Sequence, residues 1–265
     1  MRLGWLSDLH LNFLQEDQLQ SFIQDLSSTH VDAWLISGDL AEAPTIVQYL
    51  QLLQENLGPP IYFVLGNHDF YRGSFARVHE EVDAFTKGHT NLHWLTTSQP
   101  ASLSSGLTLI GDDAWGDARL GDPEGSQVVL NDFHLIQELT SLSKRERIAA
   151  CRNLGDRAAD RIRHKLDQAA ASALRVVIVT HVPPFSGAAW HEGKICEDDW
   201  LPWFSCSAMG EVILECAHAH PGCKFTVLCG HTHGGGHYQA APNVGIHTAE
   251  AEYGVQRIQE IFEFE

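Results

Sequence analysis

The feature that most constrains the fold of this chain is a repeated pattern in which a short apolar run ends abruptly in histidine, aspartate or asparagine. The pattern is clearest at Ile61–Leu65, a β-branched and aromatic run followed at once by Gly66–Asp69, which reads GNHD. Such a run is typical of a fully buried strand, and glycine lets the backbone turn sharply at its end. Because the arrangement occurs four more times, a single chance turn does not explain it. The other runs are Leu3–Ser7 before DLH (8–10), Ala33–Ser37 before GD (38–39), Arg175–Val179 before TH (180–181) and Phe225–Cys229 before GHTH (230–233).

Segments with helical spacing separate these runs along the chain. Their apolar residues recur at intervals of three and four, which predicts amphipathic helices. Alternating strands and helices favour an α/β fold with the helices outside the sheet, and in such folds ligands gather beyond the carboxyl ends of the strands. All five polar motifs fall at that end of a predicted strand. The predicted helices span 16–29, Pro44 to the break at Gly58, 75–85 and 207–220, and further β-structure is predicted at 107–110 and from Val244 onward.

The segment from 117 to 174 departs from this alternation. It begins with a polar loop and continues in a long charged stretch, 144–174, rich in arginine, alanine and leucine. It reads as a mostly helical insertion, which forms either part of a cap over a site or an ordinary outer-layer helix. Since no stretch has the composition of a linker, we predict one domain over 1–265.

Charge and cysteine usage limit the partners and the compartment. The formal net charge is −17, which argues against binding to duplex nucleic acid or to an anionic membrane. Bound cations would still allow a small anionic substrate. No apolar run reaches the length of a membrane span or of a signal peptide, so we expect a cytoplasmic protein. The six cysteines form no CxxC pair and are expected to be reduced, mostly buried thiols; a zinc site at Cys206, Cys216 and Cys223 is the alternative.

The side chains at the strand ends form a chemically coherent set. Carboxylate oxygen, amide oxygen and imidazole nitrogen suit divalent first-row metals, and the absence of cysteine disfavours a structural zinc site. Seven ligands are too many for one tetrahedral ion. They suit two ions that share a bridging carboxylate and lie roughly 3.5–4 Å apart. The set consists of Asp8, His10, Asp39, Asn67, His181, His231 and His233, with His68 beside them.

In order along the chain, the motifs DLH, GDLAE, GNHD, THVPP and GHTH resemble the signature of the calcineurin-like metallophosphoesterase superfamily. The resemblance extends from Asp8 to His233, nearly the whole chain. It implies an α/β fold that is a four-layer α/β/β/α sandwich, with two mixed β-sheets and a dimetal site at the carboxyl ends of the strands. It further implies that one metal is held by Asp8, His10 and His233, the other by Asn67, His181 and His231, and that Asp39 bridges them.

The resemblance also implies an enzyme, a metal-dependent phosphoesterase for a small phosphomonoester or phosphodiester. A metal-bridging hydroxide would attack phosphorus, and His68 would donate a proton to the leaving oxygen. Asp69 is expected to hold the His68 imidazole in its charged form and to raise its pKa. The metals would be two of Mn, Fe, Zn, Ni or Co, with Mn or Fe favoured. Further residues expected near the substrate are Asp112, Asp113, Trp115, Trp190 and His191; for Asp113 and Trp115 the alternative is a capping or packing role.

Departures from individual branches of the superfamily narrow this hypothesis. The GDLAEAP segment lacks the arginine of the serine/threonine protein phosphatases and the tyrosine of the purple acid phosphatases. Hydrolases of the lipid A pathway carry arginine where this chain has His68, and the DNA repair nucleases have a DNA-binding apparatus that such an acidic chain does not supply. Small bacterial-type phosphatases and phosphodiesterases remain. The alternative is a non-catalytic protein-interaction scaffold with the same fold, which the complete set of expected ligands disfavours.

Overall fold

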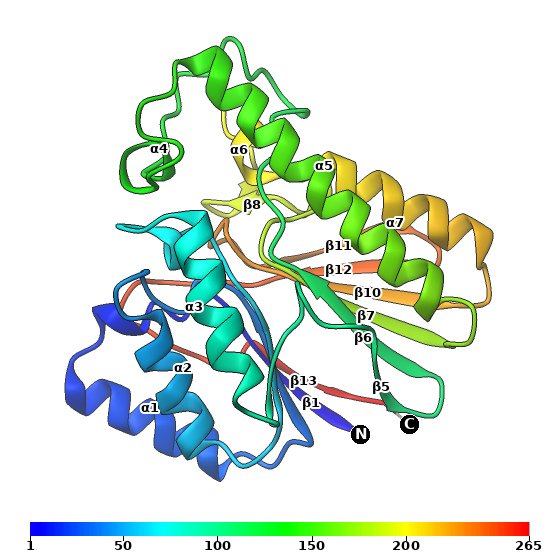
Figure 1. Cartoon of the computed structure of the whole chain (residues 1–265). Helices are drawn as coiled ribbons and strands as arrows, with labels where there is room; N and C mark the ends of the chain where they lie inside the picture. Colours follow the sequence, from blue (N-terminus) through cyan, green and yellow to red (C-terminus); the bar gives the residue numbers. More distant parts are fainter. Residues whose placement is uncertain (265) are drawn as a thin grey trace.

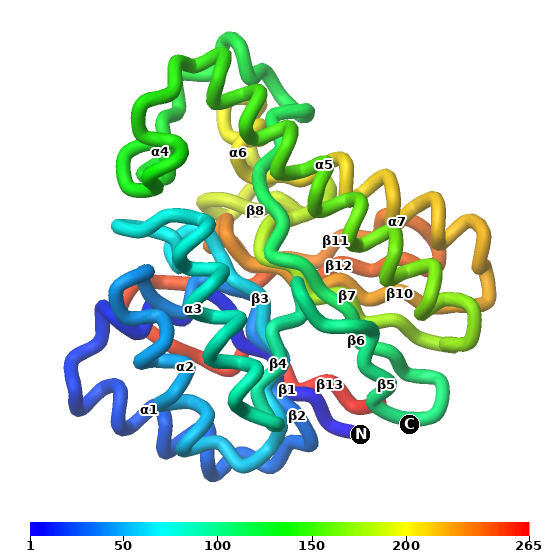
Figure 2. The backbone as a smooth tube through the Cα atoms, viewed as in Figure 1, coloured from blue at the N-terminus to red at the C-terminus, as the bar shows by residue number. Residues whose placement is uncertain are grey.

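A computed structural model describes residues 1–264, which form two mixed β-sheets that face each other (Figure 1, Figure 2). The first sheet has the order β13-β1-β2-β3-β4. Its strands are parallel except for β13, which runs antiparallel beside β1. The strands are β1 (Arg2–Leu6), β2 (Ala33–Ser37), β3 (Ile61–Val64), β4 (Leu92–Trp94) and β13 (Glu260–Glu263).

The second sheet has the order β11-β12-β10-β7-β6-β5. Its four central strands are parallel, and β5 and β11 close the two edges in antiparallel pairs. A separate two-stranded ribbon joins β8 (Trp190–His191) to β9 (Lys194–Ile195). The strands of the large sheet are β5 (Ala101–Ser104), β6 (Leu107–Asp112), β7 (Arg175–Thr180), β10 (Lys224–Cys229), β11 (Gly236–Ala241) and β12 (Val244–Thr248).

Helices cover the outer face of each sheet, as Figure 1 shows. The first sheet is covered by α1 (Glu16–Ser28), α2 (Ile46–Asn56) and α3 (Phe75–Lys87). The second is covered by α5 (Lys144–Ala169) and α7 (Ser207–Ala219). The predicted four-layer α/β/β/α sandwich is therefore confirmed. The shorter elements are α4 (Asp132–Leu135), α6 (Leu201–Phe204), η1 (Leu11–Phe13), η2 (His68–Phe70) and η3 (Ser186–Ala188).

Alternation along the central strands divides the core into three layers. In β2, Trp34 and Ile36 pack among residues of the outer helices, whereas Leu35 points toward the other sheet. In β7, Ile178 faces the helices and Val179 faces the first sheet. Because neighbouring side chains of a strand point to opposite faces, continuously apolar strands are what a sheet buried on both faces requires. Both sheets are therefore packed on both faces.

The charged stretch that begins at Lys144 is an outer-layer helix. It ends at Ala169, earlier than the predicted 174, and its Ile162 and Leu166 pack in the same core cluster as residues of α7. The short α4 that precedes it reaches the functional site described below. The strands β4 and β5 were not predicted, because they are only three and four residues long and carry no clear periodicity.

The structure also bears on the predictions about the cysteines and about membrane-spanning segments. All six cysteines are free, and five of them are buried. In the part of the chain that the structure describes, no group of candidate metal ligands contains a cysteine. The alternative zinc site therefore has no support. Within residues 1–264, no helix is both long enough and apolar enough to cross a lipid bilayer.

Candidate metal centre

The ends of five strands bring the seven predicted metal ligands to one edge of the sandwich. Loops after β1, β2 and β3 of the first sheet carry four of them, and loops after β7 and β10 of the second sheet carry three. The site therefore lies on the seam between the sheets, and neither sheet alone could assemble it. The first sheet supplies Asp8, His10, Asp39 and Asn67, and the second supplies His181, His231 and His233.

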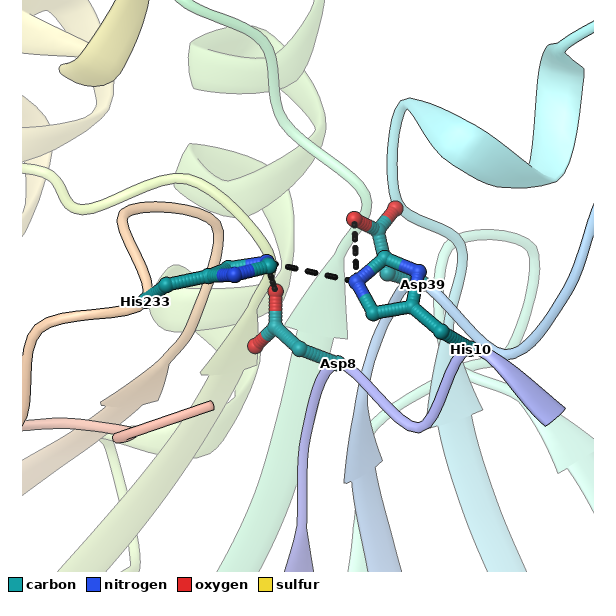
Figure 3. Close-up of side chains that lie close together, drawn as sticks. All are labelled: Asp8, His10, Asp39 and His233. Carbon is teal, nitrogen blue, oxygen red and sulfur yellow. Dashed lines mark hydrogen bonds and ion pairs between the residues drawn. The ribbon is translucent and has the colours of Figure 1, made fainter. Parts of the chain in front are cut away.

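Four of these residues form a group that could hold one ion. The ligand atoms of Asp8, His10, Asp39 and His233 all lie within 4.8 Å of one another (Figure 3). The Nε2 atoms of His10 and His233 are 3.2 Å apart, and His233 Nε2 is 3.5 Å from Asp8 Oδ1. Ligands around one cation with bonds of about 2.0–2.2 Å lie roughly 3.0–3.5 Å from each other, so the observed spacing fits a metal ion.

The other three residues form a second group with equally short spacing. Asn67 Oδ1 lies 3.0 Å from His181 Nε2 and 3.0 Å from His231 Nδ1, and the two nitrogens are 3.2 Å apart. Asp39 connects this group to the first. Its Oδ1 is 3.4 Å from His181 Nε2, and its Oδ2 is 3.7 Å from His10 Nε2. One carboxylate oxygen therefore faces each group, as a bridging ligand requires.

Backbone carbonyls fix which ring nitrogen of the two buried histidines in the second group carries the proton. His181 Nδ1 donates to the carbonyl of Ser37 over 2.8 Å, and His231 Nε2 donates to the carbonyl of Trp203 over 3.1 Å. Burial lowers the pKa of both rings, so each carries one proton. The lone pair then lies on the nitrogen that faces Asn67. Such outer hydrogen bonds orient metal-ligating histidines in proteins generally.

The backbone of the candidate site is strained. Five of the seven residues have a left-handed φ: 49° at Asp8, 41° at His10, 53° at Asp39, 71° at His231 and 59° at His233. For residues other than glycine each such conformation costs about 1–3 kcal/mol, and it persists only where surrounding contacts enforce it. Strain concentrated at five convergent side chains indicates a functional site rather than a set of ordinary turns.

Gly66 is required for space rather than for its φ. A Cβ atom at this position would lie 2.1 Å from Asp39 Oδ1 and 2.7 Å from His181 Cε1. The sequence predicted that Gly66 is needed for a sharp backbone turn. Its φ does not lie in the left-handed region, so this turn does not require a glycine. The glycine of GNHD therefore allows the β3 end to approach the Asp39 carboxylate.

Electrostatics also favour a cation at this position. Burial and the nearby Asp8 and Asp69 carboxylates raise the pKa of Asp39. Burial and the neighbouring rings of His68 and His233 lower the pKa of His10. Buried carboxylates beside neutral imidazoles lack compensating positive charge, and divalent ions would supply it. The donor set and its spacing thus fit two metal ions.

His68 lies beside the two groups and lines the cavity above them. Its ring centroid is 4.6 Å from that of His10 and 4.2 Å from that of Tyr71. Its backbone amide donates to Asp39 Oδ1 over 2.9 Å, which fixes the start of η2 against the central carboxylate. Burial lowers the pKa of His68 to about 3, and the rings of His181 and His233 add to the shift. The side chain is therefore neutral in the protein alone.

The prediction that Asp69 holds the His68 imidazole and raises its pKa is wrong. The Asp69 carboxylate accepts hydrogen bonds from the backbone amides of Ala41 and Gly66, each over 2.8 Å. Successive residues of a 3₁₀ helix lie about 120° apart around its axis, so the side chains of His68 and Asp69 point in different directions. His68 Nδ1 is buried without a hydrogen-bond partner in the described chain. Burial raises the pKa of Asp69 to about 7, and its contacts tie the β2 and β3 loops together.

A cavity of about 250 Å³ lies over the candidate ligands. Of the five residues predicted near the substrate, only His191 lines it. Asp112 instead receives two hydrogen bonds from Arg161, and Asp113 accepts from the Leu65 amide. Asp112 is the last residue of β6 and Asp113 follows it directly, so both lie at a strand end like the candidate ligands, but they stabilise the scaffold. The cavity is lined by Asp39, Asn67, His68, Tyr71, Leu130, Asn131, Asp132, His191, Phe204, His231, Thr232, His233 and Tyr253.

Sequence reasoning missed Asp132, the first residue of α4. Its Oδ1 accepts hydrogen bonds from Asn67 Nδ2 over 2.8 Å and from the Tyr71 hydroxyl over 2.7 Å. These bonds orient the Asn67 amide so that its oxygen faces His181 and His231. No strand precedes Asp132, so the strand-end pattern gives no signal for it. Tyr71 could have been suggested as a residue of the site, because it follows the GNHD motif after a single residue, Phe70.

We expect Asp132→Ala to weaken the second metal site selectively. Without its acceptor the Asn67 amide can rotate, and loss of such an outer contact typically costs about 10–100-fold in metal affinity. Titration of the metal-free protein with Mn²⁺ should show one site with nearly unchanged affinity and one weakened site. Tyr71→Phe is the matched control. It keeps the Asp132–Asn67 hydrogen bond, so it should lower the metal affinity of the second site less than Asp132→Ala does. Two unchanged affinities in Asp132→Ala would refute this role.

Comparison with known proteins agrees with this geometry. The model of a family described as calcineurin-like phosphoesterase matches residues 1–235. No curated protein sequence matches the chain. Several solved structures share the fold. A phosphopantetheinyl hydrolase (PptH) from Mycobacterium tuberculosis superposes with a TM-score of 0.68 at 18% identity, covering 95% of this chain and 89% of that chain.

Two further structures show how widely the fold is used. A dimetal phosphatase from Danio rerio has a TM-score of 0.57 at 14% identity, with 94% of this chain and 87% of that chain covered. The Plasmodium protein GAP50, described as the anchor in the inner membrane complex, has a TM-score of 0.50 at 13% identity. The match covers 98% of this chain and 76% of that chain. At these identities the likeness shows the fold alone, so the function has to be argued from the site.

Proposed function

The chain belongs to the calcineurin-like phosphoesterase family, and we propose that this phosphoesterase hydrolyses a small phosphate ester with two divalent metal ions bridged by Asp39. The observation that carries the proposal is the position of the Asp39 carboxylate. One of its oxygens faces His10 and the other faces His181, each in a separate ligand group. Mn or Fe is favoured, because the donors are carboxylate, amide and imidazole without thiolate.

Each group of residues has its own part in the proposed reaction. Asp8, His10 and His233 would hold one ion, and Asn67, His181 and His231 the other. Two bound cations would neutralise the phosphate charge and acidify a water molecule for in-line attack. The carbonyls of Ser37 and Trp203 keep the ligating nitrogens of the second group free of protons. The strained backbone at five of the seven residues would hold their side chains in place, so that little reorganisation is needed during the reaction.

His68 is proposed to protonate the leaving oxygen. It lines the cavity directly beside both ligand groups, within reach of a phosphate ester bound there. Burial keeps the ring neutral in the protein alone. A negatively charged phosphate next to the ring would favour the imidazolium form and raise its pKa again. His68 would thus be charged chiefly in the substrate complex, in which a general acid is needed.

The alternative of a protein-interaction scaffold receives less support. The likeness to GAP50 illustrates that a protein with this fold can serve as an anchor. In the present chain, however, both ligand groups are complete and have the spacing of coordinated donors. The strain at five of these residues would have no function in a scaffold. These observations favour catalysis.

The proposal is tested by metal-dependent turnover of two chromogenic esters. We expect the Mn²⁺-loaded protein to release p-nitrophenolate from bis-p-nitrophenyl phosphate, from p-nitrophenyl phosphate, or from both. Removal of metal by a chelator should lower the rate by about 100-fold or more, because the cations supply several kcal/mol of charge stabilisation. Re-addition of Mn²⁺ should restore the rate, and a chelator already saturated with Mn²⁺ should have no effect. Failure with both esters, or a rate that survives chelation, would contradict the proposal.

A further inference from the structure

The C-terminal segment 249–259 lies outside the residues that match the family, yet it runs along the candidate metal centre. The backbone amide of Ala251 donates to the carbonyl of His233 over 3.2 Å. The side-chain amide of Gln256 donates to the carbonyl of Leu9 over 2.8 Å. Since Leu9 lies between Asp8 and His10, the segment is attached to the two loops that carry Asp8, His10 and His233.

The segment presents Tyr253 in a defined turn. Val255 N donates to Glu252 O over 3.1 Å, and Gly254 between them has a φ of +81°, as the third residue of a type II turn requires. Reciprocal hydrogen bonds close the base of the segment: Glu250 N donates to Gln259 Oε1 over 3.1 Å, and Gln259 Nε2 donates to Glu250 O over 2.8 Å. The position of Tyr253 is therefore set by the fold.

Tyr253 packs directly on the candidate site. Its ring centroid is 4.6 Å from that of His10 and 5.1 Å from that of His233. Its hydroxyl is 3.4 Å from His68 Nε2, and the side chain lines the cavity. Even so, Tyr253 remains 50% exposed, and its neighbour Phe13, at 5.2 Å between ring centroids, is 47% exposed. We call these two adjacent rings, Phe13 and Tyr253, the aromatic ledge.

We propose that the aromatic ledge binds the leaving group of the substrate, and that this leaving group carries a planar aromatic or heteroaromatic ring. The inference rests on the proposed function, in which His68 protonates the leaving oxygen. Because the Tyr253 hydroxyl lies next to His68 Nε2, whatever is attached to that oxygen extends beside Tyr253. An aromatic ring there would cover apolar surface that is otherwise in contact with water. It would also gain from packing against the Tyr253 ring.

Binding of two non-hydrolysable anions tests the ledge without turnover. Phenylphosphonate and methylphosphonate carry the same phosphoryl group, and only the first carries a ring. We expect the Mn²⁺-loaded protein to bind phenylphosphonate about tenfold more tightly, as measured by calorimetric titration. Tyr253→Ala should reduce this preference to about twofold or less. Tyr253→Phe, which keeps the ring and removes the hydroxyl, should retain it.

Control variants separate loss of the ring from damage to the turn. Val255→Ala changes an exposed side chain of the same turn and should keep the full preference. Phe13→Ala, on η1 rather than in the segment, should reduce it in part. Equal binding of both phosphonates to the unmodified protein would contradict the proposed role of the aromatic ledge. A preference for phenylphosphonate that survives Tyr253→Ala would contradict it as well. So would a Tyr253→Ala protein that weakens both phosphonates equally, since Tyr253 would then only support the site.

The two probes also distinguish failure of the ledge from failure of the proposed function. Methylphosphonate reports on the phosphoryl site alone, and the ratio of the two affinities reports on the ledge. If methylphosphonate binds in a metal-dependent way and the ratio is near one, the ledge is wrong and the proposed phosphoryl site stands. If neither phosphonate binds the Mn²⁺-loaded protein, both proposals fail.

Discussion

Asp39→Ala is expected to remove both metal ions and to abolish hydrolysis. The Asp39 carboxylate lies between the two ligand groups, with an oxygen toward each. Its Oδ1 also accepts the His68 backbone amide, so its loss frees the GNHD loop as well. We expect metal content to fall from about two ions per chain to well below one, and kcat/KM to fall by about 10³-fold or more.

The measurement is metal analysis after gel filtration in buffer without added metal, together with ester hydrolysis at saturating Mn²⁺. Asp25→Ala, which removes an exposed carboxylate of α1, is the matched control and should keep both properties. Asp39→Asn retains one oxygen acceptor and should bind fewer ions than the unmodified protein but more than Asp39→Ala. Full occupancy of both sites in Asp39→Ala would show that Asp39 does not bridge them.

His68→Ala is expected to lower kcat while leaving the metal content nearly intact. His68 belongs to neither ligand group, and Asn67 beside it already supplies the oxygen that faces His181 and His231. Loss of a general acid typically costs about 10²–10⁴-fold in rate. The effect should be smaller for p-nitrophenyl esters than for esters of poorer leaving groups, since p-nitrophenolate needs little protonation.

Comparing kcat for two leaving groups in the same assay separates an acid from a structural residue. His93→Ala serves as the control. His93 lies on β4 and its ring stacks on that of Tyr62, so its removal should leave kcat and metal content unchanged. If His68→Ala instead loses one metal ion, His68 is a ligand and the acid assignment is wrong. An equal loss of rate for good and poor leaving groups would also argue against it.

The convergence of the seven candidate ligands could be predicted because strand ends carry direct sequence signals. Asp8, Asp39 and His181 each follow a buried apolar run, and the parallel strands of one sheet end at a common edge, beyond which ligands gather. The structure brings all seven predicted ligands together on this basis. The same pattern occurs at Asp112, the last residue of β6, and at Asp113 directly after it, but these two acids bond Arg161 and the Leu65 amide and serve the scaffold. A strand end by itself does not distinguish a ligand from a structural carboxylate.

Side-chain direction and contacts between distant segments could not be predicted. Adjacency in sequence suggested that Asp69 serves His68, but the turn of η2 directs the Asp69 carboxylate to the amides of Ala41 and Gly66. Asp132 begins the four-residue α4 within a long connecting segment, and Tyr253 lies in the C-terminal segment; neither part of the chain has a readable period. Loops such as these carry function without a pattern that a single sequence reveals.

The most direct test of the two-metal centre is anomalous diffraction from crystals of the protein grown with Mn²⁺. Two anomalous peaks roughly 3.5–4 Å apart are expected, as in two-metal hydrolases. One should lie among Asp8, His10 and His233, the other among Asn67, His181 and His231, with one Asp39 oxygen directed at each. A single peak, or two peaks that do not share Asp39, would contradict the proposed centre.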